Sequence, residues 1–129
     1  MFAETGVMKL TNKLDDASKA RRPDNIPTLL LKETAEVVAP VLTEIFQKSY
    51  DTAIVPEDWK KASINAIYKK GDKTSPANYR PVSLTSVSCK MMEHIIHSSV
   101  MKHLNANSIL VNYQHGFRKI GSASCRERV

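Results

Sequence analysis

The sequence predicts a mostly helical α+β fold with one β-hairpin. Apolar residues recur at helical spacing over long stretches, and two short segments alternate or cluster β-forming residues on either side of a polar turn. The chain has 129 residues, a hydrophobic fraction of 42% and a charged fraction of 25%. These values are typical of one globular domain with a modest core.

The first and last helices are predicted from apolar stripes. Apolar residues at helical spacing predict a short amphipathic helix over 7–19. A wider stripe predicts a long amphipathic helix from Val87 to about Asn105, which Thr85 or Ser86 can cap. The stripe consists of Val87, Met91, Met92, Ile95, Ile96, Val100 and Leu104.

A middle helical region contains two prolines. Pro27 suits the first turn of a helix, and apolar residues continue at helical spacing to about residue 49. Pro40 lacks a backbone N–H and its ring clashes with the preceding turn. We therefore expect either two helices, roughly 27–38 and 40–51, or one kinked helix.

The hairpin carries the candidate functional residues. Segments 62–68 and 79–84 are the expected strands, and 69–76 is a polar turn rich in structure-breaking residues. Its basic side chains are Lys69, Lys70, Lys73 and Arg80. Lysine acts as a point charge toward phosphate and arginine as a bidentate fork, so a hairpin can aim both at one polyphosphate. The alternative is a solvated turn with ordinary solubilising charges.

The charge and the cysteine content limit the classes of partner and the cellular compartment that we expect for this protein. A net charge of +6 and a pI of about 9.4 favour acidic partners, chiefly nucleic acid or an anionic membrane; the alternative is a solvated basic surface with no particular partner. No run of about eighteen apolar residues predicts a membrane span, and the first ten residues lack the apolar core of a signal peptide. Two distant cysteines predict a reducing, intracellular compartment, nuclear or cytoplasmic.

The sequence lacks the residue patterns of several other nucleotide-binding, catalytic and metal sites. The chain has no Walker loop, dinucleotide fingerprint or nucleophile elbow, and the acidic pair at 15–16 reads as a solvated helix face. Cys89, His94, His97 and His103 do not have the spacing of a zinc site. We therefore expect no metal site and no catalytic residue in this chain.

Several motifs together resemble the fingers of non-LTR (LINE-like) retrotransposon reverse transcriptases. They are W-K at 59–60, I-Y-K-K-G-D-K at 67–73 and P-A-N-Y-R-P-V-S-L-T-S at 76–86. S-K-A-R-R-P-D-N-I-P at 18–27 and Q-H-G-F-R-K at 114–119 resemble the family's flanking motifs. All occur in the family's order, so the resemblance implies a partial fingers subdomain of a right-hand polymerase.

The resemblance also implies roles for individual residues. In this family the fingers hairpin closes over the incoming nucleotide, and the matching triphosphate contacts are Lys69 (or Lys70) and Arg80. Arg22 and Asn25 stand where the family has glycines, and asparagine tolerates a positive φ better than arginine. Residues expected near the template or nucleotide are Gln114, Gly116, Phe117 and Arg118.

The resemblance places catalysis outside this sequence. The family's polymerase copies an RNA template onto a DNA primer with deoxynucleotides, and its metal-binding aspartates follow the G-F-R motif in segments that this sequence lacks. We expect Mg²⁺ only in the intact parent enzyme. The expected organisation is a partial reverse transcriptase domain over 1–119, which needs the missing palm subdomain for packing. A foreign tail follows over 120–129, resembling sequencing-adaptor read-through.

Two other functions compete with this hypothesis. One is a stand-alone basic nucleic-acid-binding module. The other is a domesticated interaction protein that docks a partner helix on the apolar stripe of 87–104.

Overall fold

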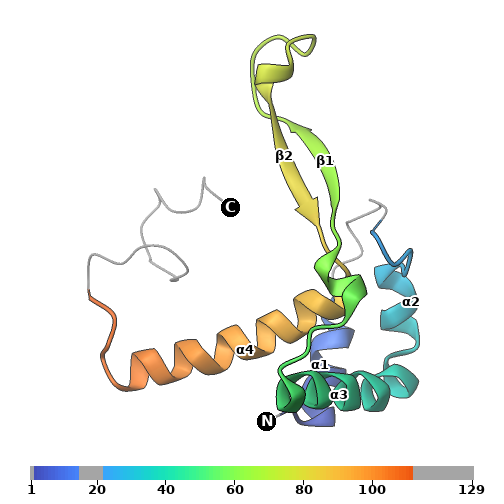
Figure 1. The fold of residues 1–129 in the computed structure, drawn as a ribbon, viewed down its shortest axis with the longest axis vertical. Helices are drawn as coiled ribbons and strands as arrows, with labels where there is room; N and C mark the ends of the chain where they lie inside the picture. Colours follow the sequence, from blue (N-terminus) through green and yellow to red (C-terminus); the bar gives the residue numbers. More distant parts are fainter. Residues whose placement is uncertain (1, 15–21, 112–129) are drawn as a thin grey trace. The chain divides into compact units, whose positions relative to one another are not determined.

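A computed structural model describes residues 2–14 and 22–111 as a mixed helical and β structure with one antiparallel hairpin (Figure 1). This confirms the predicted α+β class. The elements in chain order are α1 (Glu4–Asn12), α2 (Thr28–Glu33), α3 (Ala35–Thr52), a 3₁₀ turn (Glu57–Lys60), β1 (Ser63–Tyr68), a second 3₁₀ turn (Pro76–Asn78), β2 (Tyr79–Leu84) and α4 (Val87–Ala106).

The chain divides into two compact units, Met1–Ile95 and Ile96–Val129, with the boundary inside α4. The first unit contains α1 to α3, the hairpin and the beginning of α4. Of the second unit, the structure describes only the remainder of α4 and the residues to 111. Over the described residues, no helix has the length and apolar character needed to cross a bilayer.

The core of the first unit forms where α1 packs against α3. Val7 and Thr11 of α1 are buried, and Thr11 satisfies its hydroxyl by donating to the Val7 carbonyl at 2.8 Å. The helix begins earlier than the predicted residue 7 and ends at Asn12. Its buried face follows Val7 and Thr11, whereas Leu10 and Leu14 of the expected stripe are only half-buried.

The helical break falls at Thr34, so the prediction that Pro40 divides this region is wrong. The Thr34 backbone leaves helical geometry (φ −105°, ψ 19°), and its hydroxyl donates to the Leu30 carbonyl at 2.6 Å. Pro40 lies inside α3. A buried stripe runs unbroken past it, so side-chain burial compensates for the lost hydrogen bond. The stripe consists of Ala35, Ala39, Leu42, Phe46 and Ser49.

A row of four aromatic rings extends the core toward the hairpin. Phe46 is fully buried and lies 5.8 Å from both Phe2 and Trp59, measured between ring centroids. Phe2 also meets Tyr50 edge-on at 6.0 Å. Tilted and edge-to-face rings at these separations attract each other beyond the area they bury. Phe46 is therefore the centre of the apolar packing in this unit.

The predicted ends of the strands and of the last helix agree with the structure to within two residues. Ser86 caps α4, because its hydroxyl oxygen accepts a hydrogen bond from the Cys89 amide at 3.2 Å. Val87, Met91 and Met92 of the apolar stripe are buried in the structure. These three side chains are part of the chain's own core, so they do not form an exposed surface on which a partner helix could dock.

Replacing Phe46 with alanine should lower the free energy of unfolding by about 3–5 kcal/mol, because it removes a fully buried ring and leaves a cavity. Val37→Ala on the same helix is the control, since that side chain is 76% exposed and its loss should change stability by no more than about 0.5 kcal/mol. Urea unfolding of both variants measures the difference. Similar losses for the two would contradict this description of the core.

Candidate functional site

The register of the hairpin determines which side chains share a face. Ile67 pairs with Arg80 and Tyr68 pairs with Tyr79 in the antiparallel ladder. Because side chains alternate along a strand and directly paired residues point the same way, Arg80 and Ile67 lie on one face and the two tyrosines on the other. The ladder continues one step further, where the Lys69 amide donates to the Asn78 carbonyl at 2.8 Å.

This register, continued by the Lys69–Asn78 hydrogen bond, places Lys69 on the same face as Arg80. Lys69 lies two residues after Ile67 and so continues the face that carries Arg80, as a diagonal neighbour within reach of a long side chain. Both residues are exposed, and neither side chain forms a hydrogen bond or ion pair within the described part of the chain. Two unengaged cations on one face can bind one anion together.

The other two basic residues of the turn are placed differently. Lys70 is exposed at a bend beyond the strand, where the alternation of the ladder no longer assigns it a face. The Lys73 ammonium lies 5.6 Å from the centroid of the Tyr68 ring, in the geometry of a cation–π contact. The hairpin therefore separates Lys73 from the pair formed by Lys69 and Arg80.

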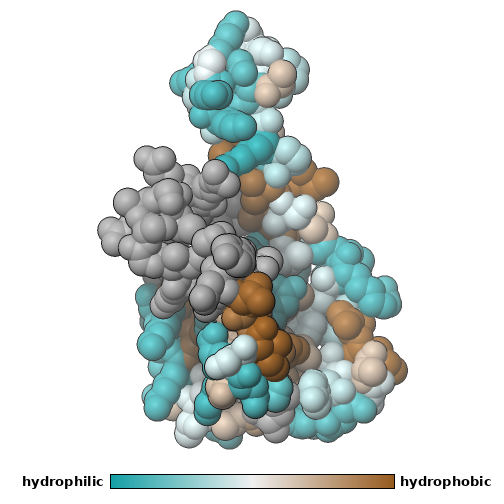
Figure 2. Space-filling view, turned by 90° about the vertical axis from the view of Figure 1, so that its left-hand side faces the viewer, coloured by the Kyte–Doolittle hydropathy of each residue, from teal (hydrophilic) through white to brown (hydrophobic). Residues whose placement is uncertain are grey.

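The surface chemistry of the hairpin changes along its length. Its tip is mainly hydrophilic, whereas apolar side chains gather lower on the strands (Figure 2). Ile64 and Ile67 belong to opposite faces and are 70% and 42% exposed. Residues 69–80 contain four basic side chains and one acidic one. The tip is thus a small positive surface whose favoured ligands are anions.

The acidic residue of the tip builds the turn. Asp72 accepts hydrogen bonds from the Thr74 amide at 2.9 Å and the Thr74 hydroxyl at 2.7 Å. These bonds, the amide first, lower the pKa of the Asp72 carboxyl below its usual value because they favour the charged form. Asp72 therefore has a structural role and does not neutralise Lys69 or Arg80 by direct contact.

Gly71 is required by the shape of the turn. Its φ is +94°, a conformation that side chains other than glycine rarely adopt. A Cβ at this position would approach the Asn78 side-chain nitrogen to 2.7 Å. The same Asn78 nitrogen donates to the Asp72 carbonyl at 2.7 Å, so the two ends of the turn are packed against each other.

The base of the hairpin is attached to the helices by two long-range hydrogen bonds. The Trp59 indole N–H donates to the Ser88 hydroxyl at 3.0 Å, at the start of α4. The Arg22 guanidinium donates to the Thr85 carbonyl at 2.8 Å. No local sequence pattern predicts this second contact, because its partners are 63 residues apart.

Asn25 and Arg22, the two residues that stand where the family has glycines, have different backbone conformations in the structure. Asn25 has a φ of 54°, in the left-handed region that asparagine tolerates. Arg22 does not have a positive φ. The expectation that Arg22 fits poorly is therefore wrong, because its backbone needs no glycine and its side chain anchors the β2–α4 junction.

Cys89 and the histidines do not form a reactive centre. Among the described residues, no group of three His, Cys, Asp or Glu side chains is close enough to hold a metal ion. Burial, together with the neighbouring Glu93 carboxylate, raises the pKa of the Cys89 thiol to about 11. The thiol is therefore protonated at neutral pH and is a poor nucleophile or metal ligand.

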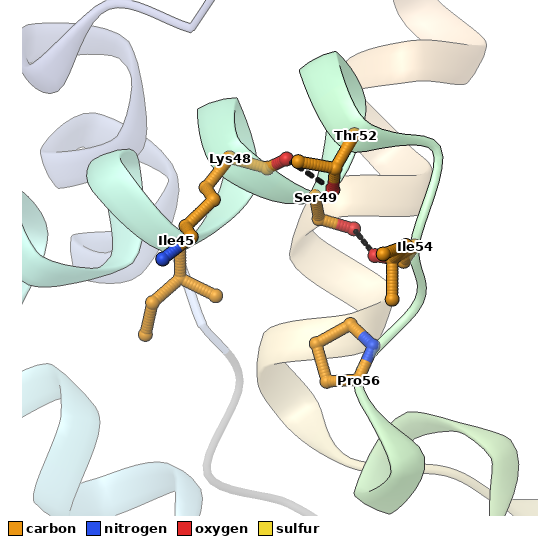
Figure 3. Close-up of a pocket in the computed structure, with 6 residues that line it drawn as sticks. All are labelled: Ile45, Lys48, Ser49, Thr52, Ile54 and Pro56. Atoms are coloured by element: carbon orange, nitrogen blue, oxygen red, sulfur yellow. Dashed lines mark hydrogen bonds between the residues drawn. The ribbon is translucent and has the colours of Figure 1, made fainter.

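A smaller and a larger hollow are lined by described residues of the first unit. The smaller is next to the end of α3, where Ser49 donates to the Ile54 carbonyl and Thr52 to the Lys48 carbonyl (Figure 3). The larger has a volume of about 580 Å³ and is mostly apolar, with Asp24 and Asp58 among its lining residues. None of the residues that line either hollow belongs to the hairpin turn. The predicted residues Gln114, Gly116, Phe117 and Arg118, and the tail over 120–129, lie outside the described residues.

Sequence comparison finds similar proteins among the mobile elements of Drosophila melanogaster. The chain is 32% identical over 97 residues to the "Probable RNA-directed DNA polymerase from transposon BS" and 30% identical over 102 residues to its counterpart from transposon X-element. It is also 30% identical over 101 residues to the RNA-directed DNA polymerase from mobile element jockey. These alignments cover 74% to 78% of this chain but only 11% of the length of each relative. No family model matches the chain.

The Asp72 carboxyl should titrate below the usual range for aspartate, because both of its hydrogen bonds from Thr74 favour the charged form. A lowered pKa stabilises the turn above the ordinary aspartate pKa, and this stabilisation is lost as the pH falls through the lowered value. An NMR titration of the side-chain carboxyl measures the pKa. Thr74→Val, which removes one donor, should raise it part of the way, whereas an ordinary pKa in the unmutated protein would contradict the described turn.

Proposed function

We propose that this chain, a relative of the RNA-directed DNA polymerases of non-LTR retrotransposons, supplies the nucleotide-gripping hairpin of the fingers in such an enzyme. The proposed parent reaction joins a DNA primer's 3′-hydroxyl to the α-phosphate of a deoxynucleotide on an RNA template and releases pyrophosphate. The observation that carries the proposal is the shared exposed face of Lys69 and Arg80.

The chemistry of the two side chains suits a triphosphate. A guanidinium presents a planar fork that can hold two phosphate oxygens, and an ammonium adds a compact point charge beside it. In phosphoryl transfer, negative charge builds up on the phosphate oxygens and on the leaving group, and positive groups positioned there lower the barrier. Arg80 and Lys69 would orient the nucleotide and stabilise the departing pyrophosphate.

We assign no part of metal binding to this chain. The Mg²⁺ ions expected of the parent enzyme would stabilise the attacking and leaving oxygens, and they require several carboxylates arranged together. The described residues contain no such group. By the family resemblance we also propose that Gln114, Gly116, Phe117 and Arg118 lie near the template or nucleotide.

Arg80→Ala should reduce nucleotide use more than Lys73→Ala. We would graft the hairpin into an active relative and measure steady-state kinetics. Loss of a charge-assisted fork should lower kcat/KM by about ten- to a hundredfold, whereas Lys73→Ala, whose ammonium lies over Tyr68, should have an effect of a few fold at most. Equally small effects would mean that both charges are merely solvated.

The purified chain should incorporate no nucleotide when supplied with primer, RNA template, deoxynucleotides and Mg²⁺. The physical reason is that the residues the structure describes contain no carboxylate cluster that could hold the ions. Primer extension followed on a sequencing gel tests this, with the intact chimera as the positive control. Template-dependent extension by the chain alone would require a catalytic centre that we have not assigned.

A further inference from the structure

The two tyrosines on the face opposite Arg80 close the hairpin ladder. Tyr68 and Tyr79 are the last pair within the two strands, and their rings meet edge-on with centroids 5.7 Å apart. Each hydroxyl reaches beyond the ladder into the turn. Tyr68 donates to the Gly71 carbonyl at 2.5 Å, and Tyr79 donates to the Lys73 carbonyl at 2.8 Å.

These hydroxyl bonds hold a turn that is long for a hairpin. Residues 69–78 separate the strands, and connections of that length are normally more mobile than turns of two to five residues. Here the tyrosine hydroxyls bind the carbonyls of Gly71 and Lys73, and the Asn78 side chain binds the Asp72 carbonyl between them. Phenylalanine rings would pack against each other equally well. The specific contribution of the tyrosine hydroxyls is therefore to hold the turn.

We infer that Tyr68 and Tyr79 are positioning residues, whose hydroxyls hold the turn so that Lys69 and Arg80 on the opposite face present a preformed triphosphate-binding geometry. This inference rests on the proposed function. A turn that is already ordered loses less conformational entropy when the ligand binds, so the same charges bind more tightly. On the tyrosine face, the Lys73 ammonium lies over the Tyr68 ring, so Lys69 and Arg80 are the residues that bind the triphosphate.

The test uses the whole chain and deoxythymidine triphosphate as the probe. Tyr79→Phe keeps the ring and removes only the hydroxyl. We expect the exchange of the Thr74 and Ser75 amides to accelerate and the affinity for the probe, measured by calorimetric titration, to fall about two- to fivefold. Tyr50→Phe is the matched control, because it makes the same chemical change on α3 and should alter neither quantity.

A double-mutant cycle separates positioning from general loosening. If Tyr79 acts through Arg80, Tyr79→Phe should have little further effect on affinity in an Arg80→Ala background. An undiminished effect there, or faster exchange with unchanged affinity in the single variant, would overturn the inference and leave the proposed function intact. If Arg80→Ala does not weaken binding at all, or the unmutated chain does not bind the probe, the proposed function fails and the inference fails with it.

Discussion

The packing of Trp59 joins the helical core to the hairpin. Its ring lies 5.8 Å from the buried Phe46 ring, and its indole N–H donates to Ser88 at the beginning of α4. One side chain therefore links α3, the segment that enters β1, and the helix that follows β2. No residue of either strand is fully buried, so the strands bury little apolar surface. An isolated two-stranded hairpin is only marginally stable, so attachment at its base matters more here than in a larger sheet.

The sequence predicted the elements whose signals are local. The strands, the cap at Ser86 and the long last helix depend on alternation, a hydroxyl at the right position and an apolar stripe, all within a few residues. The break at Thr34 was missed because Pro40 is the stronger local signal, yet burial of the α3 stripe outweighs it. The role of Arg22 was missed because its partner, Thr85, is distant in sequence.

The candidate site was predicted as a set of residues but not as a geometry. Sequence motifs selected the basic residues of the hairpin, and the similarity of the chain to three RNA-directed DNA polymerases agrees with the family that those motifs resemble. Only the register separates Lys69, which shares a face with Arg80, from Lys73, which lies against Tyr68. A shift of one residue would exchange the two faces, so the proposed grip depends on the Ile67–Arg80 pairing.

NMR mapping of this chain with a deoxynucleoside triphosphate would show whether the ligand contacts the hairpin face that carries Lys69 and Arg80. We expect the largest shift changes at the Arg80 guanidinium and the Lys69 ammonium, with smaller ones at the neighbouring Ile67. Changes concentrated on the tyrosine face, or spread evenly over all lysines of the chain, would contradict this expectation.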